Sequence, residues 1–270
     1  MRGASRAALA ATRTQLTAAL DDGADPEQLA DELFGVAQLL DSQPGLRRAL
    51  TDPARNAEAR SGLAGDLFGG RVSTAAAELI TGAAGSRWSA PGDLGDATQE
   101  LAVLALVAAA DDAGRLDDLE DELFRFSRVV SSYPDLRTAL ASESVTAGHK
   151  RELLDALLGG KVTTQTLRLV GEAATRPRGR SLDVNLEEYA RLAAQRRDRL
   201  TAEVHVALPL TAGQRDRLGD ALAALYGHEV HLNVVLDPQI VGGMSVRIGD
   251  DLIDGTIVSR IDDLKRRLSA

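Results

Sequence analysis

The sequence contains no cysteine, and aromatic residues make up only 3% of its 270 residues. The lack of cysteine excludes disulfides, zinc sites with thiolate ligands and thiol nucleophiles. The scarcity of aromatic residues leaves a core to be built from leucine, valine, isoleucine and alanine, which favours helices. At this length we expect about two domains.

Long apolar runs are absent as well. The longest one, LAVLALVAAA at 101–110, is half of the ~20 residues that a membrane-spanning helix needs. The first residues, MRGASRAALAATRTQL, contain three arginines and no apolar segment of the kind found in signal peptides. We therefore expect a soluble protein without a secretion signal.

No part of the sequence concentrates positive charge. The net charge of −9 divides into −3 for each of the ranges 1–95, 96–200 and 201–270. A nucleic-acid-binding protein usually carries a basic domain or stripe. The even distribution therefore argues against a nucleic-acid partner.

What the sequence does contain is a repeat, at an offset of 90 residues. DELF at 31–34 recurs at 121–124. Between 31–84 and 121–174 there are 20 identities in 54 positions without a gap. We interpret the two segments as copies of one duplicated unit.

Each copy has the pattern of a bundle of short antiparallel helices. Apolar residues at helical spacing form one stripe in each copy, and these stripes are Leu29, Leu33, Val36 and Leu40, and Leu119, Leu123, Phe126 and Val130. Pro44 and Pro134 are predicted to end these helices, because the residue before proline avoids the helical conformation. Glycine pairs are predicted to end a later helix and hydroxyl side chains to cap the next one, namely Gly69-Gly70 and Gly159-Gly160, then Ser73/Thr74 and Thr163/Thr164.

From Thr201 onward the apolar residues alternate instead, which predicts strands. The predicted order is a strand through Val204, Val206 and Leu208, a helix from Thr211 to near Gly227, three strands over 230–236, 244–248 and 252–254, and a closing helix with Ile257, Ile261, Leu264 and Leu268. The fold class is therefore mainly α with a small α+β tail. Two tandem antiparallel helical bundles, 1–97 and 98–200, precede a βαββα C-terminal domain, 201–270.

No constellation of catalytic or metal-binding residues is apparent. In HEVH at 228–231, His228 and His231 are three apart on a predicted strand and point to opposite faces, so a solvated strand end is favoured over a metal site. The acidic run at 111–122 lacks calcium-loop spacing and suits a helix start. The stretch VGGMSVRIGDD at 241–251 lacks the ending of a phosphate-binding loop. We expect neither an active site nor a cofactor.

Six arginines could form a basic patch, at Arg176, Arg178, Arg180, Arg196, Arg197 and Arg199. Acidic residues flank them, at Asp183, Glu187, Glu188 and Asp198, and no aromatic residue is interleaved for base stacking. Intramolecular pairing or a protein partner is therefore favoured over nucleic acid.

The tail LNVVLDPQIVGGMSVRIGDDLIDGTIVSRIDDLKRRL, 232–268, resembles the C-terminal signature of the ATP synthase delta subunit family, also called the oligomycin-sensitivity-conferring protein family. The matching positions are Asp237, Pro238, Ile240, Gly242, Gly243, Val246, Arg247, Gly249, Asp250, Ile253, Asp254 and Gly255. Residues 98–200 are similar to the family's six-helix bundle. The resemblance thus covers 98–270, and 1–97 is an additional copy of the bundle.

The resemblance implies a non-catalytic, cofactor-free subunit of the peripheral stalk, or stator, of an F-type ATP synthase. One copy per synthase would join alpha subunits on the catalytic head to the b subunit, so that proton flow couples to ATP synthesis. The implied location is the cytoplasmic face of the bacterial cell membrane, with attachment only through the complex. The alternative is a free-standing helical adaptor or regulator.

In the family, the bundle receives the N-terminal helix of an alpha subunit between its first and fifth helices, and the C-terminal domain holds the end of b. The corresponding apolar residues are Leu101, Leu104, Val107, Leu167 and Val170. These five residues are the predicted partner-binding site, and the alternative for each is an ordinary core position. The extra copy leaves open which bundle contacts alpha.

Overall fold

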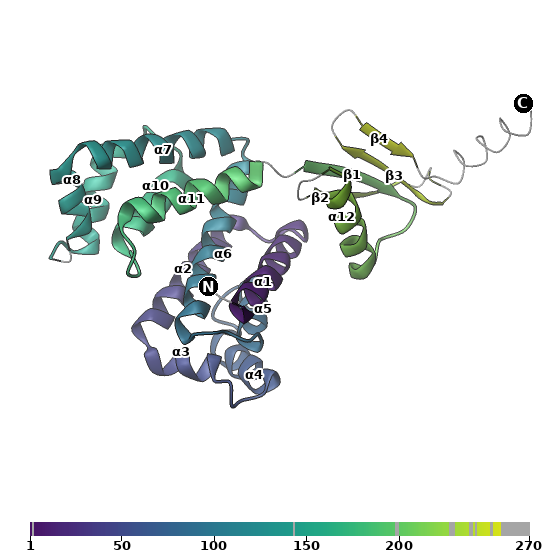
Figure 1. The fold of residues 1–270 in the computed structure, drawn as a ribbon, viewed down its shortest axis with the longest axis horizontal. Helices are drawn as coiled ribbons and strands as arrows, with labels where there is room; N and C mark the ends of the chain where they lie inside the picture. The colour runs from purple at the N-terminus through teal and green to yellow at the C-terminus, as the bar shows by residue number, and fades with distance from the viewer. Residues whose placement is uncertain are drawn as a thin grey trace, which may run out of the picture. The chain divides into compact units, whose positions relative to one another are not determined.

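A computed structural model describes residues 1, 3–142, 144–197, 200–226, 230–237, 240, 242–248 and 251–254. The chain divides into two compact units, Met1–Ala193 and Ala194–Ala270 (Figure 1). The first is helical and the second contains a small sheet. The predicted fold class, mainly α with a small α+β tail, is therefore confirmed.

The helical unit contains the same set of four helices twice. In the first copy these are α2 (Pro26–Ser42), α3 (Pro44–Thr51), α4 (Ala57–Phe68) and α5 (Thr74–Gly85), and in the second they are α7 (Leu116–Ser132), α8 (Pro134–Ala141), α9 (Ala147–Leu158) and α10 (Thr164–Thr175). Each boundary in the second set lies 90 residues after its counterpart. The predicted correspondence in helix order is confirmed.

The helix ends form where the sequence predicts them. Ser73 and Thr163 cap α5 and α10, because their hydroxyls accept hydrogen bonds from backbone N–H groups three residues later. Gly70 and Gly160 follow α4 and α9 with φ of 70° and 69°, a left-handed conformation that favours glycine. The apolar stripes that contain Leu33 and Leu123 are buried.

Hydrogen bonds between helices repeat as well. The carboxylate of Glu32 accepts hydrogen bonds from the N–H and hydroxyl of Ser73, and Glu122 accepts the same two from Thr163. The buried side chains of Arg60 and Lys150 each donate to a backbone carbonyl 24 residues further on. The two copies therefore share tertiary contacts as well as helix boundaries.

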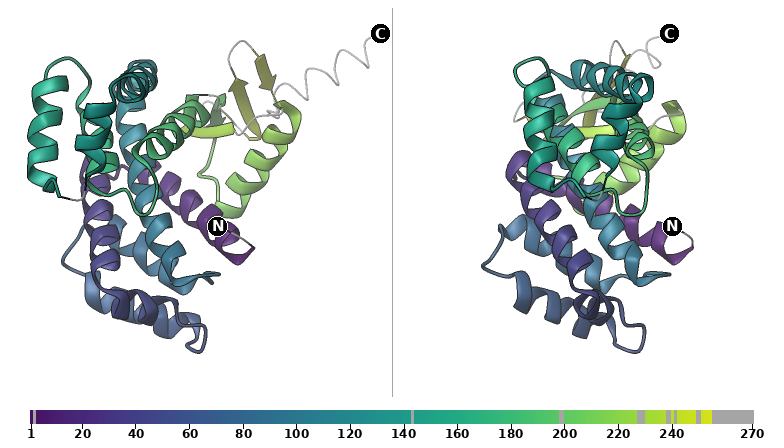
Figure 2. Two further views of the ribbon diagram at one scale, coloured as in Figure 1. Left: turned by 60° about the vertical axis from the view of Figure 1, so that its left-hand side comes forward. Right: turned by 90° about the vertical axis from the view of Figure 1, so that its left-hand side faces the viewer.

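Three further described helices precede the sheet: α1 (Ala4–Asp21), α6 (Pro91–Asp112) and α11 (Leu182–Arg197). α6 begins at Pro91, where Asp93 accepts a hydrogen bond from the N–H of Ala90. α6 contacts α1, α2 and α5 on one side and α7 and α10 on the other, and it lies between the two sets in Figures 1 and 2.

A single hydrophobic core runs through both copies and includes most of α6. From Leu94 to Ala110 most side chains of α6 are buried, as expected of a helix that is surrounded on all sides. The predicted boundary at 97/98 falls inside this helix. The division of the helical part into two domains stays a prediction.

The described part of the second unit is a four-stranded sheet with one crossover helix. Its elements are β1 (Leu200–Val206), α12 (Ala212–Tyr226), β2 (Val230–Leu236), β3 (Met244–Ile248) and β4 (Asp251–Asp254), in the sheet order β2-β1-β3-β4. β1 runs parallel to β2 and antiparallel to β3. The first strand ends before Leu208, which is exposed, whereas alternation predicted that Leu208 belongs to it.

The sheet has its own small core. Ala202, Val204 and Val206 of β1 are buried with Leu222 of α12 and with Val246 of β3. The predicted closing helix, with Ile257, Ile261, Leu264 and Leu268, lies outside the described residues. Among the described helices, none has both the length and the apolar composition that a membrane span requires.

Candidate partner-binding surfaces

The five residues predicted to receive a partner helix lie on α6 and α10. Leu101, Val107 and Val170 are buried, whereas Leu104 and Leu167 are half-buried and pack against the same core. α2 of the first copy packs along α6 and contacts α10 through its polar side chains. Part of this face is therefore covered from within the chain, and the partner-binding role of the five residues stays a prediction.

α2 can cover this face because it buries two stripes. One stripe, which contains Leu33, lies in the core of its own copy. The second stripe is Ala30, Phe34 and Ala37, also buried. Phe34 lies with Leu154 and Leu167 of the second copy around a cavity of about 230 Å³.

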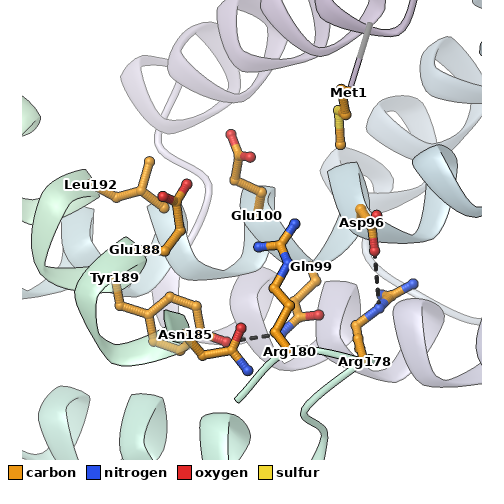
Figure 3. Close-up of a pocket in the computed structure, with 10 residues that line it drawn as sticks. All are labelled: Met1, Asp96, Gln99, Glu100, Arg178, Arg180, Asn185, Glu188, Tyr189 and Leu192. Atoms are coloured by element: carbon orange, nitrogen blue, oxygen red, sulfur yellow. Dashed lines mark hydrogen bonds and ion pairs between the residues drawn. The ribbon is translucent and has the colours of Figure 1, made fainter. Parts of the chain in front are cut away.

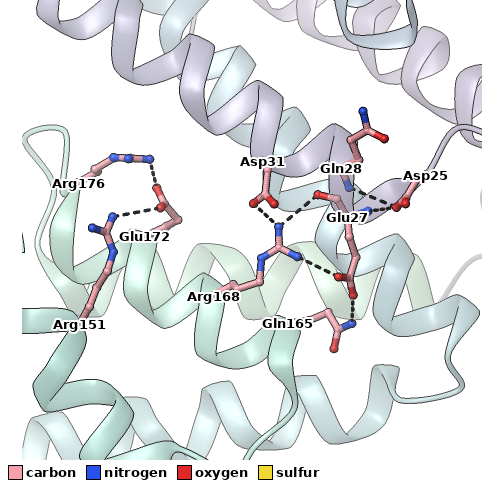
Figure 4. A network of polar contacts seen from close by, with 9 residues as sticks. All are labelled: Asp25, Glu27, Gln28, Asp31, Arg151, Gln165, Arg168, Glu172 and Arg176. Carbon is pink, nitrogen blue, oxygen red and sulfur yellow. Dashed lines mark hydrogen bonds and ion pairs between the residues drawn. The ribbon is translucent and has the colours of Figure 1, made fainter. Parts of the chain in front are cut away.

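Polar contacts also join α2 to α10 (Figure 4). Gln165 of α10 donates to the carboxylate of Glu27 at 2.7 Å. The guanidinium of Arg168 contacts the carboxylate of Glu27 at 3.3 Å and its backbone carbonyl at 3.2 Å, and it also pairs with Asp31. Bonds to both side chains and backbone fix the position of α2 along α10.

A second acidic site lies further along α10. The carboxylate of Glu172 is contacted by Arg176 at 2.6 Å and by Arg151 of α9 at 4.0 Å. Arg176 also donates to the side chain of Gln38 on α2 at 2.7 Å. Burial raises the pKa of Glu172 above its ordinary value, although both arginines act to lower it.

Arg178 joins the two copies in the loop before α11. Its guanidinium contacts Asp41 of α2 at 2.6 Å and Asp96 of α6 at 3.3 Å, and it donates to the carbonyl of Gly95 at 2.7 Å. Burial raises the pKa of Asp41, against the effect of Arg178. The predicted intramolecular pairing is confirmed for Arg178 and for Arg176.

The acidic partners of these two arginines lie on α2, α6 and α10. Arg176 and Arg178 pair with Glu172, Asp41 and Asp96 rather than with the flanking acids of α11. The reason is geometric, because both arginines precede α11 and face α2, α6 and α10. Arg199 and Asp198 of the predicted patch lie outside the described residues.

α11 also contacts α6 through a polar side chain, as Figure 3 shows. The side-chain amide of Gln99 donates to the hydroxyl of Tyr189 at 2.8 Å. Burial raises the pKa of Tyr189 to about 12. The adjoining cavity of about 30 Å³ is large enough to hold a water molecule.

The family-signature positions form turns and strand ends in the second unit. The N–H of Asp237 donates to the carbonyl of Val206 at 2.9 Å and thereby closes the end of β2 onto β1. Gly243, directly before β3, has a φ of 86°, a left-handed conformation that favours glycine. Arg247 lies on β3 opposite Glu203, and Asp254 lies on β4 opposite Ser245.

Other predicted positions in this unit cannot be placed. Pro238, Gly249, Asp250 and Gly255 of the signature lie outside the described residues, as does His228 of HEVH. Within the part of the chain that the structure describes, no three acidic or histidine side chains are grouped closely enough to hold a metal ion.

The fold defines a helical repeat protein with a separate α+β unit. Residues 103–268 match the family model for the "ATP synthase delta (OSCP) subunit". The chain belongs to this family. The resemblance seen in the tail and the second bundle is thereby confirmed.

Named relatives match over the whole length of the chain. It is similar to ATP synthase subunit delta of Streptomyces avermitilis, with 52% identity over 269 residues that cover 99% of this chain and 98% of that protein. The same-named protein of Streptomyces coelicolor is 49% identical over 271 residues, 100% of this chain and 99% of that protein. That of Thermobifida fusca is 45% identical over 272 residues and covers both chains fully.

The relatives therefore also contain the first copy, although the family model begins only at residue 103. Among solved structures, a chain from the cryo-EM structure of the Toxoplasma gondii mitochondrial ATP synthase hexamer matches with a TM-score of 0.28 and 16% identity. The match covers 62% of this chain and 95% of that chain.

Proposed function

We propose that this chain is the non-catalytic peripheral-stalk subunit of an F-type ATP synthase, joining the alpha subunits of the head to the b subunit. The observation that carries the proposal is the full-length similarity to proteins named ATP synthase subunit delta. One copy would act per synthase, at the cytoplasmic face of the bacterial cell membrane and attached only through the complex.

The division into two units suits a link between two partners. Each unit has its own hydrophobic core, so each can carry a separate attachment surface. By analogy with the family, the helical unit holds alpha and the α+β unit holds b. Leu104 and Leu167 are the two predicted contact residues with exposed surface, and they are the ones that an alpha helix can touch.

Reconstitution tests this function. Membranes carrying a synthase that lacks this chain should hydrolyse ATP but pump protons poorly, because nothing keeps the head from turning with the rotor. Adding the full chain should restore ATP-driven proton pumping and retain the head on the membrane. Pumping is measured by quenching of a pH-sensitive dye.

The contrary result is a chain that stays in the supernatant and leaves pumping unchanged. That result would favour the free-standing adaptor. A second test uses the full chain with Leu104→Asp and Leu167→Asp. This variant should restore less pumping, because charged side chains disfavour an apolar helix contact.

A further inference from the structure

The face by which α2 contacts the second copy has a counterpart on α7. We call the face of α2 formed by Glu27, Asp31 and Phe34 the inner docking face. The residues 90 positions later are Asp117, Asp121 and Phe124, which we call the outer docking face. Both faces consist of two acidic residues followed by a phenylalanine.

The inner docking face is occupied within the chain. Phe34 is 5% exposed and lies beside Leu154 and Leu167. Its two acidic residues receive the guanidinium of Arg168. The apolar ring is thus buried between helices, and a basic side chain neutralises the acidic residues.

The outer docking face is open in the described structure. Phe124 is 58% exposed, and Arg128 lies over its ring at 5.9 Å from the centroid. Asp117 is also exposed, and Asp121 pairs with the exposed Arg125 of the same helix. On α2 the counterpart of Arg125 is Gly35, so Asp31 has no arginine there and pairs across the interface instead.

An exposed phenylalanine on its own is ordinary. Here, however, the same residue of the same motif has a known use within the molecule. Phe34 is buried where the two helical copies meet, and the described residues after the second copy form no third one. The contact is of the head-to-tail kind, which leaves one unused face at the end.

We propose that the outer docking face binds a helical surface of another synthase subunit. This partner has a slot between small or aliphatic side chains for the ring of Phe124 and an arginine or lysine for Asp117 and Asp121, as α10 provides for α2. That the partner belongs to an ATP synthase rests on the function proposed above. The location of the docking surface is inferred from the correspondence between the two copies.

Charge disfavours a second copy of this chain as the partner. In a head-to-tail pair, α7 would lie on α5 of the next chain, the counterpart of α10. At the position of Arg168, α5 has the exposed Glu78, and at the position of Gln165 it has Ala75. Asp117 and Asp121 would then face a third carboxylate, and like charges at a contact oppose binding.

Photo-crosslinking on the assembled synthase tests the contact directly. A benzophenone side chain replaces Phe124 in the full chain, and the matched control replaces Val129, an exposed apolar residue of the same helix. We expect crosslinks from position 124 to a basic helical segment of another subunit, above the level at position 129. Equal or absent crosslinking at position 124 would overturn the proposal, as would crosslinks to a second copy.

Binding measurements test the same contact by affinity. Phe124→Ser and Asp121→Lys should each weaken binding of the full chain to synthase lacking it by about tenfold or more, as for a central interface residue. Val129→Ser should stay within about twofold of the unaltered chain. Circular dichroism should show native helix content for all three, because the altered side chains are exposed.

Two kinds of failure are distinguishable. Should the unaltered chain fail to bind the synthase, the proposed function is wrong and this docking surface falls with it. Should the unaltered chain bind while Phe124→Ser and Asp121→Lys bind equally well, only the outer docking face is wrong.

Discussion

Phe34 and Phe124 occupy the same place in the repeated DELF motif but have different surroundings. Phe34 is buried and lines a cavity with Leu154 and Leu167 of the second copy, whereas Phe124 is exposed. Phe34→Ala should therefore lower the free energy of unfolding of the helical unit by ~3–5 kcal/mol. Phe124→Ala should cost under ~1 kcal/mol, as for a surface change.

Urea unfolding followed by helical circular dichroism measures both losses. Leu123→Ala, next to Phe124 in sequence but buried in the core, serves as a positive control with an expected loss of ~2–5 kcal/mol. Similar losses for the two phenylalanine variants would mean that α2 does not dock on the second copy.

Glu172 is predicted to make the stability of the helical unit depend on pH. Burial raises the pKa of its carboxyl group in the folded state above its ordinary value. Between the pKa of Glu172 in the unfolded state and its higher pKa in the folded state, the folded state binds more protons. The free energy of unfolding therefore falls as pH rises through that window. Arg151, Arg176 and Asp31 are the charged groups that act on Glu172 from neighbouring elements.

The test compares the unaltered chain with Glu172→Gln in urea melts from about pH 4 to pH 7. Glutamine does not titrate, so the difference in stability between the two proteins should shift in favour of the glutamine variant as pH rises. Asp41 titrates in both proteins and cancels in the comparison. A difference that is independent of pH would contradict the raised pKa.

Among whole elements, local signals explain why the helix ends could be predicted. Proline, glycine and hydroxyl residues act within a few positions, so Pro44, Gly70 and Ser73 fix helix boundaries without knowledge of the rest of the chain. The strand-entry glycine, Gly243, is predictable for the same reason. Local chemistry thus gives most of the fold.

The contacts of α2 could not be predicted in this way. Its acidic residues pair with Arg168 across 137 to 141 positions in sequence. The letters of the DELF motif are identical in both copies, so they cannot distinguish a covered phenylalanine from an open one. Only the second stripe of α2 differs in a way that indicates another neighbouring helix. It contains Ala30 and Ala37, whereas α7 has Glu120 and Ser127 at these positions.

A charge exchange measures the α2–α10 contact. Arg168→Glu should destabilise the helical unit, because it places three carboxylates together, and adding Asp31→Arg should recover part of the loss. Both partners are partly exposed, so we expect a coupling energy of only ~0.5–1 kcal/mol from the double-mutant cycle. The exposed pair Asp121–Arg125 within α7 should give ~0.3–0.5 kcal/mol, and a larger value there than at α2–α10 would contradict this assignment.

For the molecule as a whole, α6 makes the helical unit one body. It contacts helices of both copies, and one hydrophobic core extends across them. A unit with a continuous core is expected to unfold cooperatively. The two copies should therefore lose structure together, although each one repeats the other.

The α+β unit should unfold separately from the helical unit. Its core is distinct, and Gly243 at a φ of 86° admits a β-branched side chain only with strain of ~1–3 kcal/mol. Gly243→Val should therefore lower the unfolding transition of the sheet, followed by NMR signals of β1 and β3, and leave the helical transition unchanged. Leu123→Ala should do the reverse. One transition that moves with both variants would mean that the two units fold as one, and that alpha and b do not attach to independently stable parts.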